Sequence, residues 1–151
     1  MPNIKPDQKA LEVFLKAVDC LFPVPLSHKQ DLECFAKKLY EKATVCHISS
    51  GGEILSLTAG YTDNVTDNIG YISVVASLPK ARGNGYAKKT IEEFIGIARQ
   101  KGLDAVHLYA VPENIAAVNM YRNIGFEEWR IPEEPRPDDL HLIFRIKENG
   151  K

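Results

Sequence analysis

The segment that most constrains this chain is residues 78–89, LPKARGNGYAKK, which joins an apolar run to an amphipathic helix. Residues 69–78 read as a buried strand, and residues 86–100 place apolar side chains at helical spacing. A helix that begins here presents unpaired backbone N–H groups and a partial positive charge. Gly83 and Gly85 let that backbone approach a ligand closely, because no Cβ stands in the way. The segment therefore predicts an anion-binding turn of the kind that holds phosphate.

The charges around this turn also favour a ligand. A helix N-terminus usually carries Asp or Glu, whereas Lys80, Arg82, Lys88 and Lys89 surround this one, and none of residues 79–91 is acidic. Each cation at such a position is unfavourable by roughly a few tenths of a kcal/mol unless an anion neutralises it. The charges alone leave a solvated lysine face beside a glycine turn as an equally good interpretation.

Two common phosphate-binding motifs are absent. A P-loop needs G-x-x-x-x-G-K-[ST], which the chain does not contain. The dinucleotide fingerprint needs a third glycine after Gly83 and Gly85, and Lys88 stands at that position.

Residues 82–87, RGNGYA, match the R/Q-x-x-G-x-G/A signature of the GNAT superfamily, the acyl-CoA-dependent N-acetyltransferases, and Pro79 stands where that family usually has a proline. Residues 114–126, NIAAVNMYRNIGF, resemble the family's second block, with Asn, then Ala, then a helical Tyr, then Gly-Phe. The resemblance covers about residues 69–130. It implies an α/β fold with a GNAT-like mixed, mostly antiparallel central sheet and helices on both faces. We expect one acyltransferase domain over residues 1–151.

The resemblance implies a site for acetyl-CoA, the expected cosubstrate. Its pyrophosphate would lie on the amides of residues 82–87, and its pantetheine arm would pair with the strand backbone at residues 75–77. A main-chain N–H, expected at Ser77, would polarise the acyl carbonyl. The expected catalytic residues are thus Tyr121 and Ser77, and the expected coenzyme-binding residues are Val75, Ala76, Ser77, Arg82, Gly83, Asn84, Gly85, Tyr86, Ala87, Lys88, Asn114, Ala117 and Tyr121.

Tyr121 is the general acid that the resemblance implies. Attack of an amine on the thioester expels a thiolate, and a phenol with a pKa near 10 can protonate it. Tyr121 lies one helical turn beyond Ala117, where a small side chain would leave room for the coenzyme. A core tyrosine with a satisfied hydroxyl is the alternative for Tyr121. For Asn114, which would help to hold the pantetheine arm, the alternative is a simple N-cap after Pro112.

The general base is not specified by the sequence. Many GNAT relatives carry a Glu on the strand that here reads YISVVAS, residues 71–77, and this strand has no acid. His47, Glu53, His107 and His141 are candidates by chemistry alone, and a structural role is the alternative for each. Proton transfer through water is a further route.

The acceptor is equally open. The resemblance places its entry between residues 22–27, which are apolar, and residues 130–139, which are charged. Acids near the mouth would attract a cationic amine, whereas a solvent-exposed charged loop is the alternative. The charged residues in question are Glu133, Glu134, Asp138 and Asp139, beside Arg130 and Arg136. A small-molecule amine and a protein amine both remain candidates.

The remaining elements follow from periodicity and turn residues. Helices are predicted at residues 7–21, 27–42 and 114–123, and strands at 44–49, 53–61, 105–109, 126–131 and 139–146. Ser27 with Gln30 predicts a capping box for the second helix. The first strand usual in the family could come only from residues 3–5.

Composition excludes several classes of protein. The chain has 151 residues and a net charge of −1, so it lacks the basic excess that nucleic acids and anionic membranes require. Cys20, Cys34 and Cys46 form no C-x-x-C pair, so neither a metal site nor a disulfide framework is predicted. No signal-peptide pattern and no membrane-spanning run is found, and we expect a cytoplasmic protein.

The sequence therefore predicts an acetyl-CoA-dependent N-acetyltransferase that moves an acetyl group to a primary amine by direct attack in a ternary complex. The alternative is a catalytically silent acyl-CoA-binding regulatory module. A homodimer is left open.

Overall fold

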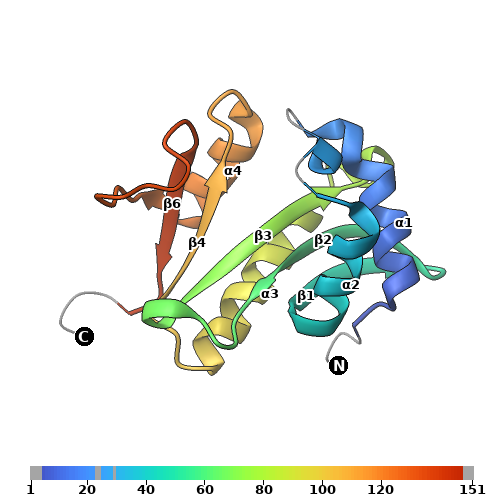
Figure 1. The fold of residues 1–151 in the computed structure, drawn as a ribbon. Coiled ribbons are helices and arrows are strands. Elements are labelled where there is room, and N and C mark those ends of the chain that lie inside the picture. Colours follow the sequence, from blue (N-terminus) through green and yellow to red (C-terminus); the bar gives the residue numbers. More distant parts are fainter. Residues whose placement is uncertain (1–4, 23–24, 29, 148–151) are drawn as a thin grey trace.

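The computed structural model describes residues 5–22, 25–28 and 30–147. Within these residues, six strands form one sheet in the order β1-β2-β3-β4-β6-β5, with α-helices on both faces (Figure 1). Only the β3–β4 pair is parallel, so the predicted mixed, mostly antiparallel sheet is confirmed. The strands are β1 (Thr44–Ser50), β2 (Glu53–Tyr61), β3 (Ile69–Ser77), β4 (Ala105–Ala110), β5 (Glu127–Glu128) and β6 (Leu140–Arg145), and the helices are α1 (Gln8–Val18), α2 (Leu32–Lys42), α3 (Tyr86–Gln100) and α4 (Ile115–Ile124).

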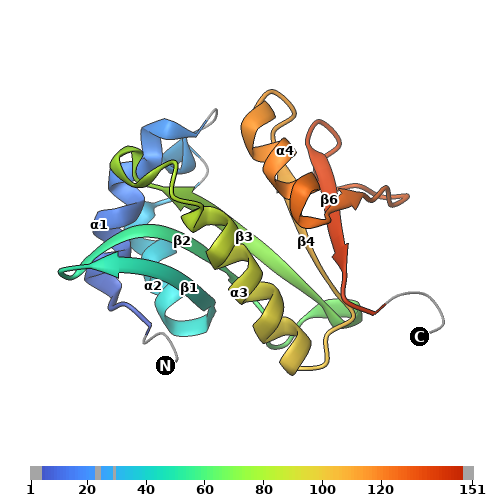
Figure 2. The same cartoon turned by 180° about the vertical axis from the view of Figure 1, so that it is seen from behind.

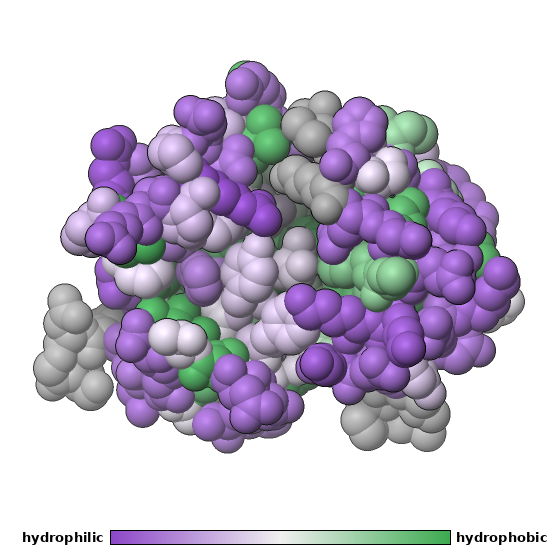
Figure 3. Space-filling view, in the orientation of Figure 1, coloured by the Kyte–Doolittle hydropathy of each residue, from purple (hydrophilic) through white to green (hydrophobic). Residues whose placement is uncertain are grey.

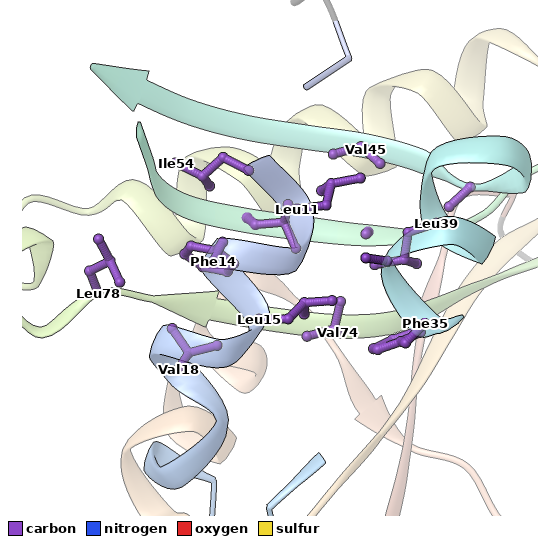
Figure 4. Close-up of a cluster of buried hydrophobic side chains, with 14 of the residues drawn as sticks. Leu11, Phe14, Leu15, Val18, Phe35, Leu39, Val45, Ile54, Val74 and Leu78 are labelled. Atoms are coloured by element: carbon purple, nitrogen blue, oxygen red, sulfur yellow. The ribbon is translucent and has the colours of Figure 1, made fainter. Parts of the chain in front are cut away.

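Helices α1 and α2 cover one face of β1–β3. Both helices place apolar side chains at helical spacing, and these form one buried cluster with the strands beneath them (Figure 4). The helical members of the cluster are Leu11, Phe14, Leu15, Val18, Phe35, Ala36 and Leu39.

Helices α3 and α4 lie on the opposite face, where α4 covers β4 and β6 (Figure 2). Phe94 and Ile91 of α3 are fully buried there, together with Val106 of β4 and Leu142 of β6. This second cluster ties the β4–β6 part of the sheet to the helix that follows the glycine turn.

A β-bulge interrupts the pairing of β2 with β3. Ala59 pairs with Val74 and Gly60 pairs with Ile72, so Ser73 is the extra residue on β3. A Cβ on Gly60 would lie only 2.0 Å from the carbonyl oxygen of Tyr71, which explains the glycine. Because of the bulge, Ile72 packs in the α3-side cluster and Val74 in the α1-side cluster.

Strands β3 and β4 are paired only at their beginnings. Ile69–Tyr71 align with Ala105–His107, and beyond this point β4 pairs only with β6. The two strands diverge from there, as both views of the ribbon show (Figures 1 and 2). The splayed strands leave facing backbone edges between them.

Most predicted elements are found within a residue or two of their expected bounds. The hairpin of β1 and β2, strand β3 and helix α3 are confirmed. The last two strands are shorter than predicted, and β5 keeps only two residues. Residues 3 and 4 of the expected first strand lie outside the described residues, and Lys5 is not in a strand.

The predicted starts and ends of the N-terminal helices were partly wrong. Helix α1 ends at Val18 and continues as a short 3₁₀ turn, Asp19–Leu21. The capping box at Ser27 does not form, because Asp31 is the N-cap of α2 and accepts from the N–H groups of its first turn. The Ser27 hydroxyl instead donates to Asp19 at 2.6 Å, which joins the two 3₁₀ turns between the helices.

Candidate active site

A cleft of about 520 Å³ occupies the gap between the splayed strands. In the space-filling view, hydrophilic residues cover most of this side, and less hydrophilic ones gather in its hollowed middle (Figure 3). Nine predicted coenzyme-binding residues line the cleft: Val75, Ala76, Ser77, Arg82, Gly83, Ala87, Asn114, Ala117 and Tyr121. Asn84, Gly85, Tyr86 and Lys88 lie on the same turn but do not line the cleft.

The turn after β3 has the backbone that an anion site needs. Gly83 and Gly85 have φ values of +85° and +73°, and Gly85 is the N-cap of α3. No side chain caps the helix, and its first turn holds no acid. A Cβ on either glycine would meet no protein atom within 4 Å, so the space before these amides is open. The turn therefore fits a phosphate group well.

One of the four cations at this turn has a carboxylate partner. The Lys80 ammonium lies 2.6 Å from the Glu53 carboxylate of β2, so Lys80 does not need a bound anion. Arg82, Lys88 and Lys89 remain exposed around the turn. Three cations, instead of the four expected from the sequence, therefore favour a bound anion at this turn.

The backbone of β3 directs unpaired groups toward the cleft. Leu78 N–H donates to the Leu55 carbonyl at 2.9 Å, and pairing with β2 continues from there along the strand. Antiparallel pairing alternates, so the N–H groups of Val75 and Ser77 point away from β2. The Ser77 hydroxyl is hydrogen-bonded within the sheet, to the Ser56 hydroxyl of β2 at 2.7 Å. Ser77 therefore offers its main-chain N–H to the cleft.

Tyr121 lies on the cleft wall with its ring in the core. It is 8% exposed and packs edge-on against Phe126. Burial raises the pKa of its phenol to about 12. The phenol therefore keeps its proton at neutral pH and is available as a donor in the cleft.

Asn114 is the N-cap of α4, and its side-chain oxygen accepts from Ala117 N–H at 3.4 Å. The capping role proposed as an alternative is therefore present. Asn114 also lines the cleft, as does Ala117.

The four candidate bases fall into two groups. His47 contacts Ser49 on edge strand β1, and Glu53 pairs with Lys80, and neither lines the cleft. His107 and His141 lie together on β4 and β6 with ring nitrogens 2.7 Å apart, and they too are not among the residues that line the cleft. Burial, with a smaller contribution from His141, lowers the pKa of His107 to about 4.

The expected acceptor walls are present in part. Phe22 and Leu26 line the cleft from the first wall, while residues 23 and 24 lie outside the described part of the chain. Arg136 and Asp139 line it from the second wall. Glu134 turns inward instead, and its carboxylate lies 2.8 Å from His141 Nδ1.

The sequence prediction missed two polar side chains of the site, Ser73 and Tyr109. Ser73 reaches the cleft through the bulge, for which the sequence gives no clear signal. The Tyr109 ring stacks on the His141 ring with centroids 4.3 Å apart, and the Arg136 guanidinium lies 5.1 Å from its centroid. Strand alternation places Tyr109 on the same face as His107, and this pattern could have revealed it.

Two findings concern metals and membranes. Among the described residues, no group of three or more His, Cys, Asp or Glu side chains is arranged to hold a metal ion. Within the same residues, no helix is long and apolar enough to span a bilayer.

Comparison with known proteins identifies a family whose model spans most of the site. The model of the GNAT acetyltransferase family matches residues 11–126, which include the turn and Tyr121. The mycothiol acetyltransferase of Renibacterium salmoninarum is 38% identical over 61 residues, which are 40% of this chain and 18% of that protein. The chain thus matches only about a fifth of the length of such curated relatives.

Solved structures share the fold at low sequence identity. A GNAT acetyltransferase from Staphylococcus aureus superposes with a TM-score of 0.74 at 16% identity, covering 93% of both chains. The PaiA N-acetyltransferase of Thermoplasma acidophilum, solved in complex with coenzyme A, gives a TM-score of 0.68 at 12% identity, covering 94% of this chain and 96% of the other.

Proposed function

The chain belongs to the GNAT acetyltransferase family, whose members use acetyl-CoA, and on this basis we propose that it transfers an acetyl group from acetyl-CoA to a primary amine. The amine attacks the thioester directly in a ternary complex. One observation carries the proposal: a single cleft joins the glycine turn, the unpaired edge of β3 and the Tyr121 phenol.

Each part of this cleft has a separate task in binding. The amides after Gly83 and Gly85, with Arg82, bind the coenzyme's pyrophosphate as a helix N-terminus binds an anion. The β3 edge at Val75 and Ser77 pairs with the amide groups of the pantetheine arm, as an added strand would. The small Ala117 leaves room for that arm.

Two groups act on the reacting atoms. The Ser77 N–H donates to the acyl oxygen, which gains negative charge as the amine attacks. Tyr121 donates its proton to the departing sulfur, and its raised pKa keeps that proton in place until the thiolate forms. The three cysteines do not line the cleft, which agrees with direct attack and no acyl-enzyme.

Calorimetry with acetyl-CoA tests the first half of the proposal, and thiol release in the presence of amines tests the second. Adenosine 3′,5′-bisphosphate serves as the phosphate-only control ligand. We expect acetyl-CoA to bind tightly and at least one of spermidine, glucosamine and 2-phenylethylamine to accelerate thiol release. Failure of acetyl-CoA to bind would overturn the proposal.

A second candidate, an acyl-CoA-binding module without turnover, is favoured by one observation: β3 carries no acid at residues 71–77. The two candidates differ in the effect of Tyr121→Phe. An enzyme loses turnover and keeps its acetyl-CoA affinity, whereas a silent module shows no amine-dependent thiol release even before the substitution.

A further inference from the structure

A polar and aromatic cluster lies beside the cleft, at the point where β3 and β4 stop pairing. We call it the histidine cluster, and it has no counterpart in the two sequence motifs. Its rings pack against one another at centroid distances of 4.3–6.3 Å. Its members are Tyr71, His107, Tyr109, Trp129, Glu134 and His141.

Hydrogen bonds run through this cluster in a fixed direction. The Glu134 carboxylate is 2.8 Å from His141 Nδ1, and His141 Nε2 is 2.7 Å from His107 Nδ1. Burial raises the pKa of Glu134, but the neighbouring Tyr109 hydroxyl and His141 imidazole outweigh it, so the pKa of that carboxyl lies below its usual value. An ionised carboxylate only accepts, so His141 must carry its proton on Nδ1. His141 Nε2 is then an acceptor, and His107 donates to it from Nδ1.

Tyr109 connects this chain of hydrogen bonds to the cleft. It lines the cleft and stacks on His141, which is hydrogen-bonded to Glu134, and its hydroxyl is near enough to the Glu134 carboxylate to perturb the pKa of that group. Burial first, and then the Glu134 carboxylate, raise the pKa of the Tyr109 hydroxyl. Glu134 Oε1 is buried and makes no hydrogen bond of its own, so the carboxylate has an acceptor to spare.

Other polar groups also surround Tyr109. The Arg136 guanidinium lies over the ring, 5.1 Å from its centroid. Asp139 lines the cleft, and its N–H donates to the Arg136 carbonyl. The Tyr71 ring lies 6.3 Å away and does not line the cleft.

We propose that Tyr109 and Glu134 take the proton that the acceptor amine loses, and that His141 and His107 hold Glu134 for this task. The inference rests on the proposed acetyl transfer. As the nitrogen–carbon bond forms and the carbon–sulfur bond breaks, the amine proton passes to Tyr109 Oη. The Tyr109 proton passes to Glu134, while Tyr121 protonates the sulfur. One proton leaves the nitrogen and another, from Tyr121, reaches the thiolate, so the transfer balances once Glu134 releases its proton to solvent and Tyr121 takes one up from solvent.

Tyr109 is a catalytic residue in this scheme, because it faces the amine. Glu134 acts through Tyr109, and the two histidines act through Glu134. His107 fixes the tautomer of His141, and His141 fixes the carboxylate. The base that the β3 strand lacks is thus supplied from β4 and from the loop before β6.

A double-mutant cycle tests the coupling of Tyr109 with Glu134. The acceptor is the amine among spermidine, glucosamine and 2-phenylethylamine that accelerates thiol release most. We expect Tyr109→Phe and Glu134→Gln each to lower kcat by about 100-fold. The double variant should lose little more, because each single substitution already interrupts the same proton path. Glu134→Gln also moves the pH profile of kcat to higher pH. Tyr40→Phe, on the exposed side of α2 and outside the histidine cluster, is the control, with kcat within about threefold of the parent and an effect that multiplies with the others.

Acetyl-CoA affinity measured on the same variants separates this inference from the proposed function. All variants retain that affinity if only proton transfer is affected. Wild-type kcat in Tyr109→Phe, or losses that multiply in the double variant, would overturn the inference while leaving the acetyltransferase assignment intact.

A measurement without any acceptor covers the case in which none of the three amines reacts. Nitrogen-15 NMR of the imidazoles at pH 7 reports the tautomers directly. We expect protons on Nδ1 of His141 and Nδ1 of His107, with Nε2 of His107 unprotonated. A His141 with no proton on Nδ1 would mean that it does not donate to Glu134, and the inference would then be wrong.

Discussion

The two walls of the cleft are built from different parts of the chain. The donor wall comes from one continuous stretch, residues 73–87, together with the first turns of α4, and it works mainly through backbone groups. The acceptor wall gathers side chains from three distant places: the α1 end, β4 and the loop before β6. A local motif can therefore specify the donor wall, whereas only the folded chain assembles the acceptor wall.

The Gly60 bulge lets Ser73 of β3 line the cleft, and altering it has the largest expected effect. In Gly60→Ala the new methyl group would meet the Tyr71 carbonyl, so β2 and β3 must shift. We expect a loss of about 3 kcal/mol in the free energy of unfolding, measured by urea denaturation. Gly96→Ala is the matched control, because its Cβ meets nothing and lies within α3. That change should stabilise the protein by about 0.5–1 kcal/mol. Equal stabilities of the two variants would contradict this account of the bulge.

The donor wall alone should be disabled by Gly85→Val. The branched side chain would occupy the open space before the α3 amides and block phosphate from their N–H groups. We expect acetyl-CoA affinity, measured by calorimetry, to fall by at least about 100-fold, or about 2.7 kcal/mol.

Gly102→Val is the control for Gly85→Val. Gly102 also has a positive φ, +79°, and also faces open space, but it lies at the other end of α3. Both variants carry similar backbone strain of about 1–2 kcal/mol, and only Gly85→Val should lose the coenzyme. A comparable loss of affinity in both would show that strain, and not the phosphate site, is responsible.

The contrast between the walls also explains what the sequence could predict. The strand, turn and helix of residues 69–100 agree closely with expectation, because period-two and period-3.6 patterns and two glycines act locally. The pairing of β4 with β6 is what brings together Tyr109, Glu134 and His141. The residue pattern within a strand does not specify which other strand it pairs with. Ser27 failed as a helix cap because Asp31 caps the same helix and Asp19 accepts the Ser27 hydroxyl.

Tyr121 belongs to the step that both walls share, so its loss should affect turnover and leave binding intact. We expect Tyr121→Phe to lower kcat by about 100-fold with acetyl-CoA affinity within about twofold of the parent, because only the proton donor is removed. Tyr40→Phe, on the exposed side of α2, is the matched control. Unchanged turnover in Tyr121→Phe would exclude the phenol as the acid.

The smallest expected effect is a pH dependence confined to the acceptor wall. His107 has a pKa of about 4 in the folded protein because it is buried, against about 6.5 when unfolded. Between these values the unfolded chain binds a proton that the folded chain does not, so stability falls as the pH falls from 6.5 to 4. His107 is only partly buried, so its share of this loss is about 1–2 kcal/mol.

Removing the histidine should remove that share of the loss. In urea denaturation, His107→Gln should lose correspondingly less stability than the parent between pH 7 and pH 4.5. If His107→Gln left the loss of stability at acid pH unchanged, His107 would not make the acceptor wall more sensitive to pH than the donor wall. The two walls would then differ only in which parts of the chain build them.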